Sequence, residues 1–144
     1  MTPKGKRYES AYAYELLRIA RGDLDSARAL SPVGPGRPEN ICYLAQQCVE
    51  KCLKAVICHL NMPVTHTHDV EALLNLLPEE HRPPNPQELF PLTEYATIRR
   101  YEEGYEILEP NDIRSIIDLG ERILVWAEKK CGNDKANSKT PSGK

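Results

Sequence analysis

The sequence predicts an all-α protein, an antiparallel up-and-down four-helix bundle with an additional short helix. Apolar residues recur at intervals of three and four over several long stretches, and clusters of proline and glycine separate these stretches. No strand-like alternation extends beyond a few residues, and the connections are short enough for antiparallel neighbours. A chain of 144 residues suits one hydrophobic core. We therefore expect a flexible lead-in over residues 1–7, a helical domain over 8–131 and a disordered tail over 132–144.

The first helix is predicted over residues 8–30. Its apolar positions keep helical spacing, and most of its charged residues lie outside that stripe. Gly22 lies inside it and destabilises it by about 1 kcal/mol relative to alanine without disturbing the periodicity. Residues 31–39 hold three prolines and two glycines, which predicts a surface loop.

The second helix, predicted over residues 41–61, is the segment around which the rest of the chain is organised. Its apolar positions cover about half of the circumference, which favours a central helix with several neighbours over a surface helix. Cys48 and Cys52 lie on the apolar face, where buried thiols behave as small hydrophobic side chains.

A compact polar row lies opposite that apolar face and consists of Tyr43, Gln47, Glu50 and Lys54. Glu50 and Lys54 are four residues apart with the acid first, the favoured order for an ion pair within a helix. One interpretation of the row is a solvated face. The alternative is a groove or interface that needs one facing partner.

The next segment, His66-Thr67-His68-Asp69, precedes a short third helix with Thr67 as its expected cap. A structural explanation is that the segment caps this helix and packs an imidazole on the second helix. A metal site or a contact with a ligand or partner is the alternative. The five cysteines lack Cys-x-x-Cys spacing, so we expect no metal and no cofactor.

The second half of the chain begins with a stiff connection rich in proline. A fourth helix is predicted over residues 89–99, with Asn85 before it as a cap and Pro91 as the point where it kinks or restarts. Residues 99–110 show little periodicity and predict a loop. The last helix is predicted from Asn111, its cap, to Cys131.

The loop after the fourth helix is the candidate ligand-binding segment. Arg99 and Arg100 offer two planar donors suited to phosphate, and Tyr101 and Tyr105 are available to stack on a base. The alternative is a solvated loop in which nearby glutamates neutralise the arginines.

Composition limits the remaining classes. A net charge of −2 gives no general basic field, so we expect no DNA binding and no attachment to a membrane. No apolar run approaches membrane-spanning length, and no signal segment follows Met1. With an odd number of cysteines, these features favour a reducing cytoplasm.

Four stretches together resemble the HEPN family of nucleotide-binding helical domains over about residues 10–130: LAQQCVEKCLKAVI, HTHDVEALL, YATIRRY and LGERILVWAEK. The resemblance implies an up-and-down bundle that is usually a homodimer. It also implies a place beside a small nucleotidyltransferase in prokaryotic two-component, toxin-antitoxin-like modules. Many members of the family are toxins that cut RNA without metal.

This sequence departs from the cleaving members, which carry an arginine, four to six residues and then a histidine. Tyr105 stands where the histidine after Arg100 would be, and no arginine in the chain has a histidine at these spacings. We therefore expect a noncatalytic subunit that binds a nucleotide or RNA and a partner. The alternatives are a ribonuclease toxin that uses Arg99 or Arg100 with a displaced histidine, and a purely structural dimer.

Overall fold

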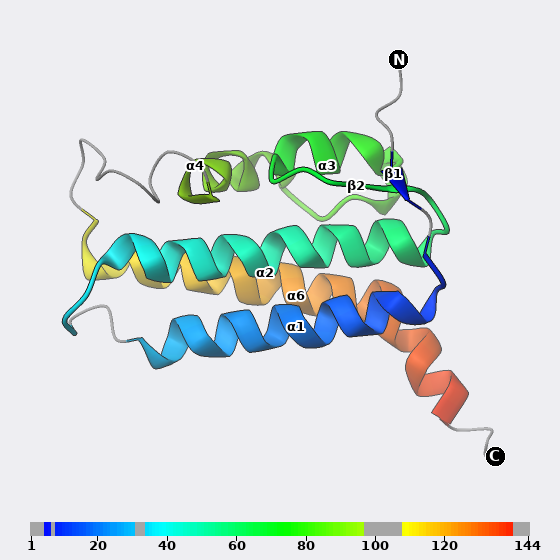
Figure 1. Ribbon diagram of the computed structural model, residues 1–144, viewed down its shortest axis with the longest axis horizontal. Coiled ribbons are helices and arrows are strands. Elements are labelled where there is room, and N and C mark those ends of the chain that lie inside the picture. Colours follow the sequence, from blue (N-terminus) through cyan, green and yellow to red (C-terminus); the bar gives the residue numbers. More distant parts are fainter. Residues whose placement is uncertain (1–4, 7, 31–33, 97–107, 140–144) are drawn as a thin grey trace.

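The computed structural model describes residues 5–6, 8–30, 34–96 and 108–139, with side chains described up to residue 132. Three long helices lie side by side: α1 (Ala11–Ala29), α2 (Pro38–His59) and α6 (Pro110–Lys139) (Figure 1). A layer of short helices covers α2: α3 (Val70–Leu76), the 3-10 helices η1 (Glu79–His81) and η2 (Pro86–Leu92), and α4 (Thr93–Ala96). The predicted all-α class is confirmed.

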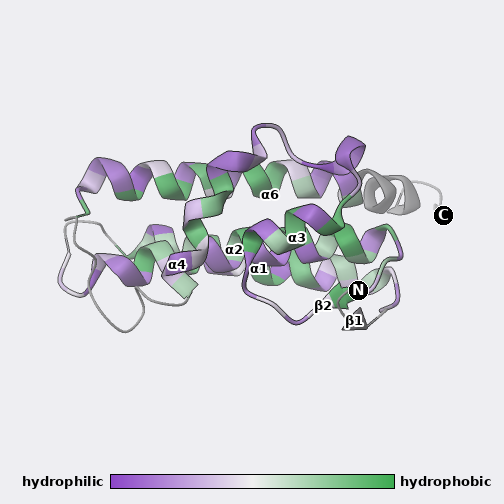
Figure 2. Ribbon diagram, turned by 90° about the horizontal axis from the view of Figure 1, so that it is seen from above, coloured by the Kyte–Doolittle hydropathy of each residue, from purple (hydrophilic) through white to green (hydrophobic). Residues whose placement is uncertain are grey.

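The chain runs up and down through this bundle, as predicted. The helix α2 is antiparallel to α1, the short helices lead the chain back along α2, and α6 runs in the direction of α2 (Figure 1). Hydrophobic and hydrophilic stretches follow one another along α6 (Figure 2). In α1 the buried residues recur at intervals of three and four, so one face of that helix is turned to the core.

The helix α2 is the centre of the core, as its wide apolar face predicted. It packs against α1, α6, α3 and α4. Cys48 and Cys52 are fully buried, and all five cysteines are buried thiols that form no disulfide. The predicted loop over residues 31–39 is too long by two residues, because α2 begins at Pro38. Proline suits that first position because the missing N–H has no partner within a helix.

The fourth predicted helix is not continuous. The prediction of one helix over residues 89–99 is wrong, because η2 and α4 divide the described part of it. Pro91 lies within η2 and cannot donate the backbone hydrogen bond that a regular α-helix requires. Asn85 has a left-handed backbone, with φ of 51°, and its side chain makes no capping hydrogen bond.

The two ends of the chain also depart from the predictions. Gly5–Lys6 (β1) pairs antiparallel with Val64–Thr65 (β2), so this part of the predicted flexible lead-in is ordered by a backbone ladder. The helix α6 continues to Lys139, so residues 132–139, predicted to be disordered, belong to a helix. Asn111, the predicted cap of α6, lies within its first turn because the helix begins at Pro110.

None of the described helices combines the length and the apolar character needed to cross a membrane.

Candidate functional site

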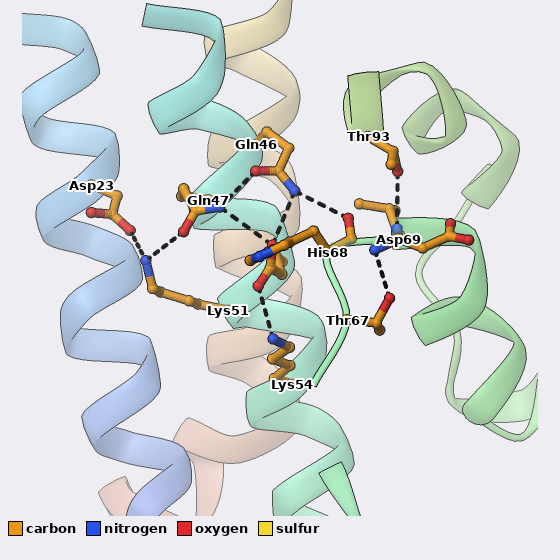
Figure 3. A network of polar contacts seen from close by, with 11 residues as sticks. Asp23, Gln46, Gln47, Lys51, Lys54, Thr67, His68, Asp69 and Thr93 are labelled. Atoms are coloured by element: carbon orange, nitrogen blue, oxygen red, sulfur yellow. Dashed lines mark hydrogen bonds and ion pairs between the residues drawn. The ribbon is translucent and has the colours of Figure 1, made fainter. Parts of the chain in front are cut away.

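A buried carboxylate, Glu50, is the centre of the most extensive polar cluster in the described part of the chain. Seven residues form this cluster, called here the Glu50 network: Asp23, Gln46, Gln47, Glu50, Lys51, Lys54 and His68 (Figure 3). The network joins α1, α2 and the segment over residues 66–69 that precedes α3.

Both carboxylate oxygens of Glu50 are occupied. Lys54 Nζ lies 2.8 Å from Oε2. Oε1 receives three contacts: Gln46 Nε2 at 3.1 Å, Gln47 Nε2 at 3.3 Å and His68 Nδ1 at 3.0 Å. Glu50 is only 3% exposed, so these contacts replace the water that an ionised carboxylate requires.

The pKa of Glu50 is lowered in this setting. Burial by itself raises the pKa of the carboxyl group, but the hydrogen bonds from Lys54 and His68, together with the charge of Lys54, outweigh burial. Glu50 is therefore ionised at neutral pH, and it acts as a hydrogen-bond acceptor for each of its partners.

A short relay extends from Glu50 to α1. The Gln47 amide donates to Gln46 Oε1 at 2.8 Å and accepts from Lys51 Nζ at 3.2 Å. Lys51 in turn forms an ion pair of 2.6 Å with Asp23. The network thus ties α1 to the centre of α2 through polar side chains.

The segment that carries His68 is held where it joins α3. The Asp69 side chain accepts hydrogen bonds from two backbone N–H groups in the first turn of α3, so Asp69 is the cap of this helix. The prediction that Thr67 caps α3 is wrong, since Thr67 Oγ1 accepts from the N–H of Asp69 instead. Thr93 of α4 accepts from the N–H of Val70, which fixes α4 beside the start of α3 (Figure 3).

The polar row predicted on α2 faces its own chain. The predicted ion pair of Glu50 and Lys54 is confirmed, but a fully solvated face is wrong for these two residues, since Lys54 is 15% exposed and Glu50 is less so. His68, packed on Glu50, fulfils the structural explanation of the histidine cluster. Tyr43 and Gln47 are half-buried, and a role for this row in binding stays a prediction.

The structure says less about the other predicted site residues. His66 is exposed, and no group of three or more metal-binding side chains occurs among the described residues. Arg99, Arg100, Tyr101 and Tyr105 lie outside the described residues, so their predicted role in binding a ligand is not tested by the geometry.

The contact with Glu50 determines which nitrogen of His68 faces the solvent. Because an ionised carboxylate only accepts, Nδ1 of His68 carries the hydrogen and Nε2 is the nitrogen that is left for a ligand. The His68 side chain is 63% exposed, so Nε2 is accessible. An imidazole oriented by a carboxylate is an arrangement suited to proton transfer.

Burial raises the pKa of the Cys52 thiol well above its usual value and makes this thiol unreactive.

Three members of the network were missed by the sequence analysis. Gln46 and Lys51 have a detectable signal, because each lies four residues from a partner on α2, Glu50 and Gln47. Asp23 has no such signal. It pairs with Lys51 only because α1 packs against α2, which no spacing along the sequence encodes.

The fold and the network define the class of the protein, a helical-bundle domain in which α2 carries a buried polar centre. The model of the HEPN domain matches residues 13–130, and the chain belongs to the HEPN family. Its structure is similar to that of TT1696 from Thermus thermophilus, with a TM-score of 0.70 and 25% identity over 82% of this chain and 97% of that one. No curated protein sequence matches the chain.

Proposed function

We propose that this HEPN protein is a noncatalytic subunit that binds a nucleotide or RNA and a partner protein. The observation that carries the proposal is membership of the family combined with the missing arginine-to-histidine spacing of its RNA-cleaving members. Without a histidine at that spacing, the arginine motif has no side chain that titrates near neutral pH. Binding is the function left for this motif.

The proposed ligand-binding segment consists of Arg99, Arg100, Tyr101 and Tyr105. Each guanidinium can make paired hydrogen bonds to phosphate oxygens, worth about 1.5–3 kcal/mol when partly shielded from water. A tyrosine stacked on a base adds about 1–3 kcal/mol. After the cost of ordering the complex, these contributions correspond to micromolar affinity.

Calorimetric titration with ATP, AMP and a short RNA tests this assignment. The parent protein is expected to bind at least one of them in the micromolar range, and Arg99→Ala/Arg100→Ala is expected to lose that binding. Arg18→Ala/Arg114→Ala is the matched control, because it removes two exposed arginines from α1 and α6. Binding weaker than millimolar, or equal binding by the parent and the Arg99/Arg100 variant, refutes the assignment.

The partner half of the proposal has two parts, a homodimer and a nucleotidyltransferase partner in a prokaryotic two-component, toxin-antitoxin-like module. Both follow from the family, whose members commonly act in this way. Light scattering at tens of micromolar protein tests the homodimer, and a monomer mass rejects it.

Co-purification of the tagged protein with the product of a neighbouring nucleotidyltransferase reading frame tests the nucleotidyltransferase partner, and failure to form a stoichiometric complex rejects it. A dimer that binds neither ligand nor partner would favour the purely structural alternative.

One observation favours a second candidate function, a metal-independent ribonuclease. In this alternative His68 would be the displaced histidine that acts with Arg99 or Arg100, because Glu50 orients its imidazole and its side chain is exposed. The proposal above expects no cleavage when the purified protein is incubated with RNA in EDTA. Cleavage that His68→Ala abolishes and Glu50→Gln weakens, while His66→Ala leaves it intact, would replace the noncatalytic proposal with this one. Cleavage that none of these changes affects would indicate a contaminant.

A further inference from the structure

An apolar groove lies on α6, on a surface that the Glu50 network does not use. Pro84 of the proline-rich connection and Ile123, Val125 and Trp126 of α6 line it, and its volume is about 430 Å³. Val125 is 38% exposed, which leaves a branched apolar side chain open to water. Trp126 is half-buried against the core, and its indole N–H has no hydrogen-bond partner among the described residues. This arrangement, called here the α6 groove, is typical of a docking surface.

Charged side chains of both signs border the α6 groove, and they differ in whether they are paired. Arg122 lies on its rim and makes an exposed ion pair of 2.8 Å with Glu88. Lys129, also on the rim, has no ion pair within the described part of the chain. Glu121 also borders the groove, but Arg21 and Arg28 of α1 bind its carboxylate at 3.1 and 2.8 Å. Lys129 is therefore the rim charge that no acid neutralises within the described residues, and it lies beside apolar walls on a protein whose net charge is −2.

We propose that the α6 groove docks a segment of a partner protein in which acidic side chains flank an apolar anchor. The anchor inserts between Pro84 and Trp126, and the acids pair with Lys129 and, in exchange for Glu88, with Arg122. Burial of the anchor supplies affinity, and the charge pairs supply orientation and selectivity. This inference rests on the partner-binding half of the proposed function and assigns it a surface.

A second copy of the chain is a poorer occupant. In a symmetric dimer built on this groove, the same patch of both copies supplies the contacts, and the acids of this patch, Glu88 and Glu121, already pair with arginines. An acidic segment instead brings carboxylates that can pair with Lys129.

The test is selection of a random library of 12-residue peptides displayed on phage, with Val125→Glu as the counter-selection target. Val125 is a surface position, so this variant is expected to fold while it places a carboxylate inside the groove. Selected peptides are expected to carry one large apolar residue between acidic ones. Because Trp126 is the sole tryptophan of the sequence, its fluorescence reports directly whether a synthetic copy of a selected peptide binds in the groove.

Matched charge reversals complete the test. Lys129→Glu is expected to weaken a selected peptide about tenfold, the loss expected for one charge-assisted contact. Arg18→Glu reverses an exposed charge on α1 and is expected to leave binding unchanged. Circular dichroism of each variant checks that the bundle is intact.

Several results would overturn the inference. No enrichment, enrichment of basic or uncharged peptides, or equal binding to Val125→Glu would each do so. Conversion of a dimer to a monomer by Val125→Glu would identify the occupant as a second copy. Quenching of Trp126 by AMP in the Arg99→Ala/Arg100→Ala variant would make the groove a nucleotide site. Nucleotide binding is measured on other residues, so its failure and failure of the α6 groove are distinguishable.

Discussion

Nδ1 of His68 lies 3.0 Å from Oε1 of Glu50, and this contact joins an exposed imidazole to a buried carboxylate. The contact fixes the segment over residues 66–69 on α2. The Glu50 side chain therefore has two roles: it contributes to the stability of the bundle, and it orients the imidazole of His68.

Removal of the Glu50 carboxylate is expected to destabilise the fold strongly. Glu50→Ala removes the buried acceptor of the Lys54 ammonium group and leaves the Gln46 amide only its longer contact of 3.5 Å with the His68 carbonyl. Breaking a buried ion pair by removal of one partner costs about 3–5 kcal/mol, and we expect a decrease in the free energy of unfolding of that size. Urea denaturation followed by circular dichroism at neutral pH measures it.

Two further variants separate the effect of charge from the effect of burial: one removes the charge of Glu50, and the other removes an exposed carboxylate elsewhere on the bundle. Glu50→Gln keeps the shape and one acceptor oxygen, so the expected loss is smaller, about 1–3 kcal/mol. Glu15→Ala removes an exposed carboxylate that pairs with Arg18 three residues away, and its effect is expected to stay within about 0.5 kcal/mol. If Glu50→Ala were as mild as Glu15→Ala, the Glu50 network would contribute little to stability.

The stability of the protein is expected to fall in acid because of Glu50. Its pKa is lower in the folded chain than in the unfolded chain, so its contribution is complete above the unfolded value of about 4.3 and is lost as pH falls through the folded pKa. The pKa of Glu121 is also lowered, chiefly by the hydrogen bond from Arg28, so part of the loss has a second source. Urea denaturation at several pH values from 7 to 3 measures the profile.

The variant Glu50→Gln isolates the share of this acid effect that belongs to Glu50. It cannot lose a charge, so its stability is expected to fall less steeply than that of the parent below pH of about 4.3, and the gap between the two proteins narrows. A constant gap across the same pH range would show that the pKa of Glu50 is not lowered by folding.

The cap of α3 gives a contrast between two neighbouring residues. Asp69→Ala removes the acceptor of two backbone N–H groups and is expected to cost about 1 kcal/mol of unfolding free energy. Thr67→Ala removes the acceptor for the Asp69 N–H, which is exposed and can bond to water, so a smaller cost is expected. Thermal or urea denaturation of the two single variants decides the order. A larger loss of unfolding free energy for Thr67→Ala than for Asp69→Ala would indicate that Thr67 caps α3, as the sequence predicted.

The same pair of residues shows why the fold was easier to predict than its details. Helical spacing of apolar residues identified the long helices, because burial of one face is a local property of the sequence. Either Thr67 or Asp69 can cap a helix, and the choice depends on the residue at which α3 begins. The backbone conformation of residues 67–69 determines that residue. The continuation of α6 past Cys131 was missed because a segment with few apolar residues gives no periodic signal.

The candidate site was predictable only where its residues share one helix. The spacing of Glu50 and Lys54 was sufficient to predict their ion pair. That Glu50 would be buried was not evident, because one of the partners of its carboxylate, His68, lies 18 residues further along the chain. A polar row on a central helix therefore indicates a facing element, and the sequence does not reveal which one.

Two helical glycines, Gly22 of α1 and Gly120 of α6, are expected to respond differently to alanine. A Cβ at Gly22 meets nothing within 4 Å, so Gly22→Ala is expected to raise the free energy of unfolding by about 0.5–1 kcal/mol, because alanine loses less backbone freedom on folding. A Cβ at Gly120 lies 3.1 Å from Cδ1 of Leu24, a fully buried side chain. Leu24 must move to admit this Cβ, and overpacking of a dense core costs about 1–3 kcal/mol, which exceeds the gain in helix propensity.

Urea denaturation of Gly22→Ala and Gly120→Ala tests the contrast. Stabilisation by Gly120→Ala equal to that by Gly22→Ala would show that the α1–α6 contact has spare room, and destabilisation by Gly22→Ala would show that this face of α1 is covered in solution.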